Sequence, residues 1–211
     1  MKDPRHDIPR PSAPATPPPD HTARQRLLAS AIDIFGRKGY AAASVREIIE
    51  QAGVTKPVLY YHFGSKEGLM MAIIQQAAGS VSAVVDRAAA DGGTTRERVF
   101  RLFAAMRGLV RAHTSELRVV HAVYYFALDL LPTFDYKVFE RIILGDLERA
   151  IRSGIESGEL RNVSPAHASI ALGAILGAFL DREMIDQDAT IGDGDLLHVL
   201  TLVFDGLCPH S

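Results

Sequence analysis

The side chains best suited to binding chemistry lie in one short run, GVTKPVLYYHFGSKEGL, at residues 53–69. Leu59 and Phe63 stand four apart and predict one buried helical face. The other faces carry an ammonium, two phenols and an imidazole, from Lys56, Tyr60, Tyr61 and His62. Such groups donate hydrogen bonds to phosphate oxygens and to the edges of bases. The run therefore predicts a short helix that contacts DNA.

The same run contains residues that would begin and end such a helix. Gly53 permits the left-handed backbone that ends one helix and turns into the next. Thr55 is a predicted N-cap, and Pro57 falls in the first turn, where its missing N–H costs nothing. Ser65 is the predicted N-cap of the following helix. A turn, a short helix and the start of another helix thus follow one another closely.

Two more helices are predicted upstream of this run. Residues 22–25 (TARQ) and 44–47 (SVRE) both have the spacing of a capping box, in which the cap and the third helical residue satisfy each other's backbone donors. Apolar residues recur at helical spacing after each box, and Gly39 predicts the end of the first helix. The predicted helices cover residues 22–38, 45–52 and 56–62. Because a tight turn joins the last two, they form a helix-turn-helix.

From residue 24 to residue 69 the chain resembles the TetR family of one-component transcriptional regulators. The resemblance covers about a quarter of the chain and rests on a combined pattern rather than on one motif. The matching residues are Ala31, Phe35, Gly39 and Tyr40, then Ser44-Val45-Arg46-Glu47-Ile48, then Ala52-Gly53-Val54, Leu59-Tyr60, Phe63 and Ser65-Lys66. The resemblance implies a homodimer that binds a palindromic operator in double-stranded DNA. It also implies release of the DNA when a small molecule binds the larger C-terminal domain.

The predicted DNA contacts come from the helix-turn-helix and the residues that flank it. Tyr60 and Lys66 are expected at phosphates, whereas Lys56, Pro57 and Tyr61 are expected at base edges or thymine methyl groups. The full predicted set is Ser44, Thr55, Lys56, Pro57, Tyr60, Tyr61, His62 and Lys66.

Length, composition and cysteine content set wider bounds. The 211 residues can form a small and a larger domain, and a hydrophobic content of 47% can fill a sizeable core. No apolar run is long enough to predict a membrane span, and the N-terminus lacks the apolar segment of a secretory signal. The single cysteine, Cys208, excludes an intramolecular disulfide and fits a reducing compartment. We therefore expect a cytoplasmic protein with no membrane partner.

The formal net charge of −2 hides an uneven distribution. Residues 20–67 hold seven Lys/Arg against five Asp/Glu, a net of +2, and residues 68–211 hold thirteen against eighteen, a net of −5. The positive charge lies where the helix-turn-helix is predicted. A local field of this sign attracts DNA even when the whole chain is acidic.

The rest of the chain reads as helices, so the predicted fold class is all-α. Most of the eleven prolines lie in residues 1–20, which predicts a disordered tail. Residues 21–68 would form the DNA-binding domain, and residues 69–211 a ligand-binding and dimerisation domain. A capping box at Thr94 and the Ser164-Pro165 pair mark helix starts, and Gly158 marks a helix end. The further helices are predicted at about 66–90, 95–112, 115–130, 134–157, 165–187 and 194–207.

The last two long helices are the predicted dimer face. Residues 166–180 are apolar nearly all round and rich in Ala and Gly, so more than one face must be covered. The cover comes either from the domain's own helices or from a second copy of the chain. A two-fold dimer would also supply the two DNA-binding domains that a palindromic operator requires. Gly177 and Leu200 are predicted at this contact.

An apolar ligand cavity is predicted from a cluster of aromatic and adaptable residues. Phe103 and Met106 share one helical face, as do His121 and Tyr125 on the next helix. Ligand sites are mostly apolar with a few polar groups, which Tyr and His supply. Ordinary core packing explains each residue singly, and the resemblance implies that a subset lines a cavity. The predicted lining residues are Phe103, Met106, His121, Tyr124, Tyr125 and Phe134.

No pattern of catalytic residues accompanies these features. The chain has no Gly-x-Ser-x-Gly elbow, phosphate-binding glycine loop or dinucleotide fingerprint, and its histidines lack metal-ligand spacing. Carboxylates and arginines alternate from Asp146 to Arg161, which predicts a solvated helix face. We expect neither an enzyme nor a cofactor or metal. The alternative to a regulator is an all-α small-molecule binding protein without operator function.

Overall fold

All regular elements of the described chain are α-helices, as predicted. The computed structural model describes residues 21–126, 135, 137–185 and 192–207, and within these ranges no strand forms. The predicted tail at 1–20, Phe134 and Cys208 lie outside the described residues. The helices are α1 (His21–Lys38), α2 (Val45–Ala52), α3 (Lys56–Phe63), α4 (Lys66–Ala90), α5 (Thr95–Ala112), α6 (Thr114–Phe126), α7 (Val138–Glu156), α8 (Pro165–Ile185) and α9 (Asp193–Leu207).

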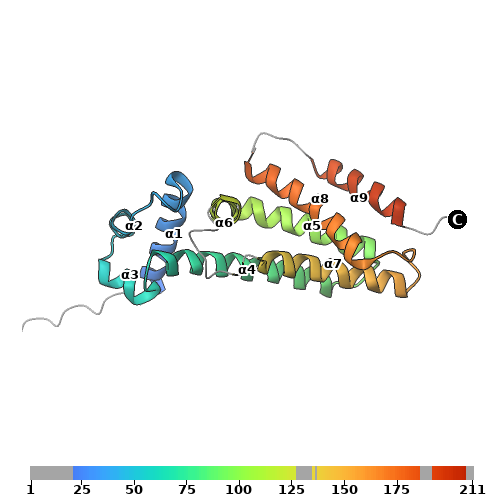
Figure 1. Cartoon of the computed structure of the whole chain (residues 1–211), viewed down its shortest axis with the longest axis horizontal. Coiled ribbons are helices and arrows are strands. Elements are labelled where there is room, and N and C mark those ends of the chain that lie inside the picture. Colours follow the sequence, from blue (N-terminus) through green and yellow to red (C-terminus); the bar gives the residue numbers. More distant parts are fainter. Residues whose placement is uncertain (1–20, 127–134, 136, 186–191, 208–211) are drawn as a thin grey trace, which may run out of the picture.

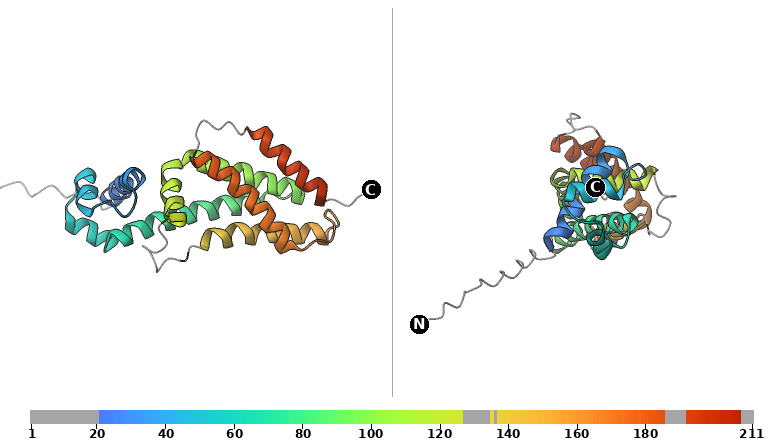
Figure 2. Two further views of the ribbon diagram at one scale, coloured as in Figure 1. Left: turned by 45° about the horizontal axis from the view of Figure 1, so that its top comes forward. Right: turned by 90° about the vertical axis from the view of Figure 1, so that its left-hand side faces the viewer.

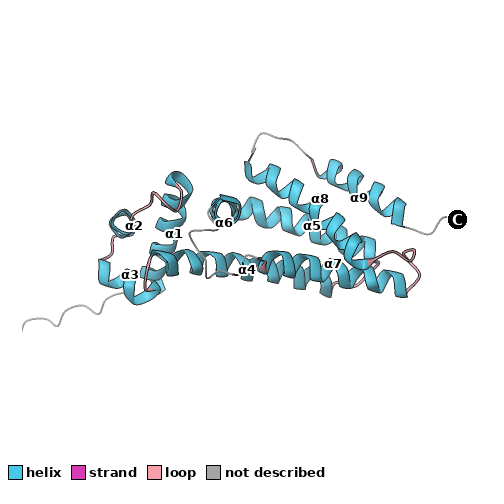
Figure 3. Cartoon of the chain, in the orientation of Figure 1, coloured by secondary structure: helices cyan, strands magenta, loops and turns pink. Residues whose placement is uncertain are grey.

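The helices form a small head and a larger body along one long axis (Figure 1). Helices α1, α2 and α3 make the head at one end, and α4 runs from the head along the body. Figure 2 shows α6 crossing at a steep angle between the head and the other body helices. Helices α5, α7, α8 and α9 complete the body, and α9 ends far from the head (Figure 3).

Most of the predicted helix ends are confirmed. The capping boxes at Ser44 and Thr94 both form, and Ser65 accepts a hydrogen bond from the backbone of Gly68. The box predicted at residues 22–25 is wrong, because α1 already begins at His21 and Thr22 lies within its first turn. The helix predicted from residue 134 begins at Val138.

Two hydrophobic clusters form the core, and α4 contributes to both. Its first half supplies Leu69, Met70, Ile73, Ile74 and Ala77 to a cluster with α1, α2, α3 and α6. Its second half supplies Val81, Val84, Val85 and Ala88 to a cluster with α5, α7, α8 and α9. One continuous helix therefore joins the head to the body. The first cluster also extends past residue 68, where we placed the domain boundary from sequence.

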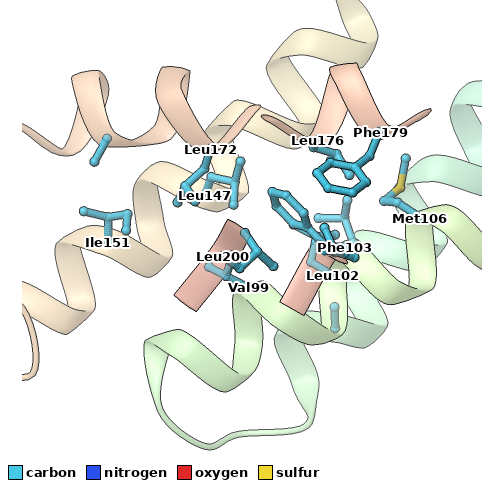
Figure 4. Packing of buried hydrophobic residues seen from close by; sticks show 14 of the residues in the cluster. Val99, Leu102, Phe103, Met106, Leu147, Ile151, Leu172, Leu176, Phe179 and Leu200 are labelled. Atoms are coloured by element: carbon cyan, nitrogen blue, oxygen red, sulfur yellow. The ribbon is translucent and has the colours of Figure 1, made fainter. Parts of the chain in front are cut away.

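The body core is closely packed around α5 and α8. Figure 4 shows Phe103 among the apolar side chains of this cluster, close to Leu176 and Phe179, with Met106 at its edge. Helices α7 and α8 approach closely at Gly173, where an added Cβ would lie 2.3 Å from Leu144 Cδ2. A larger residue at this position would require the Leu144 side chain to shift.

The face predicted as solvated around Asp146 is only partly so. Glu148 and Arg152 form an exposed pair at 2.8 Å, as expected for such a face. Asp146 is instead fully buried and forms ion pairs with Arg98 of α5 and Arg149. The prediction for Asp146 is wrong because the partner that permits burial of the carboxylate comes from another helix.

Helix α4 is long and apolar enough to cross a membrane, judged by length and composition alone. That is weak evidence for a membrane span, because the core helix of a folded domain passes the same test. Of the most apolar part of α4, 44% is buried inside the protein. Its contacts with α1, α5, α6 and α7 account for its composition.

The junction between α3 and α4 requires a glycine, which two matched substitutions can test. A Cβ at Gly68 would lie 1.9 Å from the carbonyl oxygen of Phe63, whereas a Cβ at Gly79 would meet nothing within 4 Å. We expect Gly79→Ala to stabilise the protein by up to about 1 kcal/mol through helix propensity. Gly68→Ala should destabilise it, because a backbone clash costs about 1–3 kcal/mol. Urea unfolding of both variants measures the difference, and equal stabilisation would contradict the assigned clash.

Candidate DNA-binding surface and ligand cavity

The N-terminus of α2 is fixed by a reciprocal hydrogen-bonded cap. Ser44 Oγ accepts from the backbone N–H of Glu47 at 3.2 Å, and Glu47 Oε2 accepts from the backbone N–H of Ser44 at 3.0 Å. Hydrogen bonds from Lys38 and Ser44 lower the pKa of Glu47 to about 2. The cap carboxylate therefore stays ionised, and the start of α2 is tied to the end of α1.

A tight turn then presents α3. Gly53 adopts the left-handed conformation (φ 62°, ψ 40°), and its N–H donates to the carbonyl of Glu50. Thr55 is the N-cap of α3, as predicted, although its hydroxyl makes no cap hydrogen bond. The N–H groups of Val58 and Leu59 bond instead to the carbonyl of Thr55. The exposed hydroxyl of Thr55 is therefore not used by the helix end.

The outward face of α3 carries the predicted contact residues. Leu59 is fully buried and anchors the helix in the head core. Tyr61 is 77% exposed and Tyr60 44% exposed, which is unusual for aromatic side chains. Lys56 Nζ lies 5.7 Å from the centre of the Tyr60 ring. Pro57 is exposed beside Lys56, and His62 is partly buried with its ring near that of Tyr61.

Lys66 is placed differently from the other predicted contacts. Its ammonium donates to the carbonyl oxygens of Tyr40 at 3.0 Å and Ala43 at 2.9 Å, and it lies 4.6 Å from the Tyr40 ring centre. The Tyr40 ring in turn packs edge-on against Phe35. Lys66 therefore holds the loop between α1 and α2 against the start of α4. Two of its three donors are used inside the head.

The head also exposes basic residues that the sequence reasoning missed. The exposed Arg24 and Arg26 lie in α1, and the Arg24 guanidinium lies 5.4 Å from the centre of the Phe63 ring. A guanidinium of Arg26 reaches the turn at Gly53, 3.8 Å from where a Cβ would stand. The available signal was the pair of arginines two apart early in the first helix. Tertiary packing was needed to relate them to α3.

A cavity of about 180 Å³ opens in the body between α4, α5, α6, α7 and α8. Four of the six predicted lining residues line it, namely Met106, His121, Tyr124 and Tyr125. Its other walls are mainly aliphatic. They include Val81, Val110, Leu117, Val120, Phe139, Ile143, Gly177, Leu180, Asp181 and Met184.

The polar groups of the cavity meet at one point on its wall. His121 Nε2 lies 2.9 Å from Asp181 Oδ1, so α6 and α8 are bridged there. The Tyr125 ring lies 4.5 Å from that of His121 and 5.0 Å from that of Tyr124, between centres. Burial raises the pKa of Tyr125, and the negative charge of Asp181 adds to the rise. A carboxylate, an imidazole and two phenols thus share one side of an apolar space.

Two predicted lining residues do not appear in this wall. Phe103 is fully buried in the body core and does not line this cavity. Phe134 lies outside the described residues. Phe139 and Asp181 line the cavity but were not predicted, because only the folded packing of α7 and α8 brings them to α6. Within the described ranges, no three His, Cys, Asp or Glu side chains gather as a metal site would require.

A buried ion pair holds α8 beside this cavity. Arg107 Nη2 on α5 lies 2.6 Å from Glu183 Oε1, and Arg111 Nη2 lies 2.9 Å from the same oxygen. The Arg107 and Glu183 side chains are only 2% and 13% exposed. Because Asp181 is two residues before Glu183, this pair fixes the segment that carries the carboxylate of the cavity.

A helix-turn-helix head joined by one helix to a body with an apolar cavity defines the class of helical DNA-binding regulatory proteins. Comparison with known proteins makes the assignment narrower. The sequence profile described as "Bacterial regulatory proteins, tetR family" matches residues 27–73. Residues 27–73 therefore form a DNA-binding domain of the TetR-family type.

Relatives with known roles match over different lengths. The transcriptional activator FasR of Mycolicibacterium smegmatis is 38% identical over 81 residues, which cover 38% of this chain and 37% of FasR. The chain thus matches little more than a third of that relative. The transcriptional repressor KstR of Mycobacterium tuberculosis is 23% identical over 79% of this chain and 75% of KstR.

The fold also matches solved structures along most of the chain. One is the transcriptional regulator FadR from Bacillus subtilis in complex with stearoyl-CoA. It has a TM-score of 0.71 and 18% identity, and the match covers 87% of this chain and 98% of FadR. At this identity the likeness shows a shared fold.

The ion pair beside the cavity should contribute far more to stability than an ion pair at the surface. Glu183→Gln leaves the buried Arg107 without its carboxylate, which should cost about 3–5 kcal/mol. The control, Glu148→Gln, breaks the exposed pair with Arg152 and should cost about 0–0.5 kcal/mol. Urea unfolding compares the two free energies of unfolding. Similar small losses would mean that the Arg107–Glu183 pair does not hold α8.

Proposed function

We propose that this protein is a cytoplasmic transcriptional repressor that binds a palindromic operator as a homodimer. A small apolar or aromatic effector enters the body cavity and releases the DNA. The observation that carries the proposal is the exposed face of α3 on a head that shares α4 with the cavity wall. The test is binding of the purified protein to DNA upstream of its own gene, with and without candidate effectors.

The DNA contacts are proposed from the exposed side chains around α3. Lys56, Pro57 and Tyr61 read base edges or thymine methyl groups, and Tyr60 holds a phosphate. Ser44, Thr55 and His62 flank this face and complete the contact set. Lys66 acts by holding the loop of residues 39–43, since two of its donors already bind carbonyl oxygens there.

The proposed dimer face is the exposed apolar surface of α8 and α9. Ile170 is 56% exposed and Leu202 is 60% exposed, and Ile185 and Leu197 are also largely exposed. Between Ile170 and Ile185, the exposed positions of α8 include small residues such as Ala174 and Ala178. Small residues allow close helix approach, and a two-fold contact would pair the heads. Leu200, which we placed at this contact from sequence, is fully buried in its own body core.

The proposed route from cavity to head passes through α6 as well as α4. Helix α6 supplies Val119, Val120 and Val123 to the head core, and Val120 also lines the cavity. An effector that displaces α6 must therefore disturb its packing against α1 and α4. Its effect on DNA binding depends on a difference in affinity between the two arrangements. Heads in a dimer must match half-sites about one DNA turn apart, roughly 34 Å, so a small rotation is enough.

The names of the relatives support regulation of transcription and leave its direction as part of the proposal. FasR is named an activator and KstR a repressor, and FadR was solved with stearoyl-CoA. A small-molecule binding protein without operator function is the competing hypothesis. The exposed Lys56, Tyr60 and Tyr61 favour the regulator, because such a face has no evident use in a carrier. Failure to bind any upstream DNA would favour the carrier.

Substitutions at Lys56 and Lys66 separate a contact residue from a positioning residue. We expect Lys66→Met to lower the melting temperature and to weaken binding to all sequences, because the loop of residues 39–43 loses its tether. The slope of log K against log salt should stay unchanged. Lys56→Met should leave the melting temperature unchanged and alter the preference among operator variants. Fluorescence anisotropy over a range of salt measures both effects.

The opposite result for Lys66 has a distinct signature. If its ammonium bound a phosphate, Lys66→Met would lower the slope by about 0.9 for each head of the dimer. The melting temperature of the free protein would then change little. This outcome would restore the phosphate contact predicted from sequence.

A charge at Ile170 tests the dimer face without disturbing the protomer. Because Ile170 is exposed in the single chain, Ile170→Glu should leave helical content intact and produce monomers in sedimentation experiments. The monomers should bind operator at least about a hundredfold more weakly, since linkage of two heads raises affinity. A variant that remains dimeric would place the interface elsewhere.

The matched control for this experiment is Leu200→Glu. Leu200 is fully buried in the body core, so a charge there should unfold the body rather than divide a dimer. Circular dichroism distinguishes this loss of structure from the clean dissociation expected for Ile170→Glu.

A further inference from the structure

The charged residue in the described cavity wall is an acid, Asp181. Among the fourteen described residues that line the cavity, Asp181 is the one carboxylate, and none of the fourteen is lysine or arginine. The nearby cations Arg107 and Arg111 both bind Glu183 and do not line the cavity. An anionic ligand would therefore meet a carboxylate and no guanidinium or ammonium. Burial of a ligand's negative charge without a positive partner is costly.

The position of Asp181 makes it available to a ligand. Its Oδ1 lies 2.9 Å from His121 Nε2. The side chain of Asp181 is 40% exposed, whereas that of His121 is 18% exposed. A carboxylate accepts hydrogen bonds at both oxygens. The bond to His121 orients the group and occupies one oxygen, and the exposure leaves the carboxylate reachable at the edge of the cavity.

The aromatic rings beside Asp181 also suit a positively charged ligand. Tyr124 and Tyr125 meet nearly edge-on, with ring planes 76° apart, next to the His121–Asp181 pair. Phe139 lines the cavity as well. The face of an aromatic ring attracts a cation, and a neighbouring carboxylate adds a charge-assisted hydrogen bond.

The size of the space limits the body of the ligand. An apolar cavity of about 150 Å³ in another protein holds benzene. The cavity here is about 180 Å³, so it accommodates one ring or an aliphatic group of similar size. A short linker would carry a polar group from such a ring to Asp181 at the edge.

We propose that the cavity selects a small organic cation, a protonated amine on a body about the size of one ring, with its ammonium on Asp181 and its apolar part against α5, α6 and α7. The selection of charge is a property of the cavity alone. Its use as a signal rests on the proposed function, because only a DNA-binding regulator would respond by releasing operator.

Three probes of similar shape and different charge test the selection on the full chain. They are 2-phenylethylamine, 2-phenylethanol and 3-phenylpropanoate, which are cationic, neutral and anionic at neutral pH. Calorimetric titration should give an affinity for the amine roughly tenfold above that for the alcohol, with the carboxylate weakest. Equal affinity for amine and alcohol, tighter binding of the carboxylate, or no amine binding at millimolar concentration would overturn the proposal.

Substitutions locate the binding and its charge dependence. Asp181→Asn retains an oxygen acceptor for His121 and removes the charge, so it should reduce amine affinity roughly tenfold and leave alcohol affinity unchanged. Asp86→Asn is the matched control, because it removes an exposed carboxylate that does not line the cavity. An equal loss of amine affinity in both variants would attribute the effect to net charge and overturn the assignment.

Filling the cavity provides an independent test if Asp181→Asn perturbs folding. A Cβ at Gly177 meets nothing within 4 Å, and Gly177 lines the cavity, so Gly177→Leu should occupy it without a clash at Cβ. Binding of both amine and alcohol should be lost while helical content is kept. Unchanged amine binding would mean that the amine binds elsewhere.

Release of operator DNA by the bound amine is measured separately. If the amine binds but the DNA is not released, the regulatory role is rejected while the charge selection of the cavity remains.

Discussion

The constraint on which this structure depends is the continuity of α4 through two hydrophobic cores. The helix has 25 residues and is about 37 Å long at 1.5 Å per residue. Its first half is packed against the head and its second half against the body, with no break between them. A helix of this length transmits a tilt at one end to the other, because its backbone hydrogen bonds resist local bending. The head cannot change its angle unless packing changes in both cores.

Helix α6 makes this constraint sensitive to the cavity. Valines of α6 complete the head core, while its other face carries His121, Tyr124 and Tyr125 to the cavity wall. Protein interiors are packed about as densely as organic crystals, so added volume moves a neighbouring element rather than compressing it. The walls that can move differ in their attachment. Helix α8 is fixed to α5 by Arg107 and Glu183, whereas α6 meets α8 at the partly exposed pair of His121 and Asp181. A displacement of α6 is therefore the easier response.

Local patterns in the sequence predicted the helices and their ends, and tertiary contacts account for what was missed. Ser44, Gly53 and Thr94 act within a few residues of their own position, so their roles were readable from spacing. Thr55 is an N-cap as its position predicted, but spacing does not reveal that its hydroxyl makes no cap hydrogen bond. Lys66 binds carbonyls 23 and 26 residues away, and Asp146 is buried by an arginine 48 residues away. The cavity shows the same difference between local and distant contacts. The residues on α6 were predicted from their spacing, whereas Asp181 on α8 lies 60 residues beyond its partner His121 and was missed.

The distribution of charge in the head bears on where regulation can act. Ion pairs join Arg37 to Asp33, Lys38 to Glu47 and Arg46 to Glu50, and Lys66 is turned toward carbonyl oxygens. Of the seven Lys/Arg residues counted there from sequence, these contacts leave three exposed cations, Arg24, Arg26 and Lys56, for phosphates. A single head with few such contacts gains little affinity from counterion release. In the proposed dimer, most of the affinity for an operator would then come from simultaneous binding of two heads, because linkage can raise affinity by about 10²–10⁴. In that dimer, the distance between the heads would be set by α4 and by the contact between bodies, and it would be a more effective point of control than the chemistry of α3.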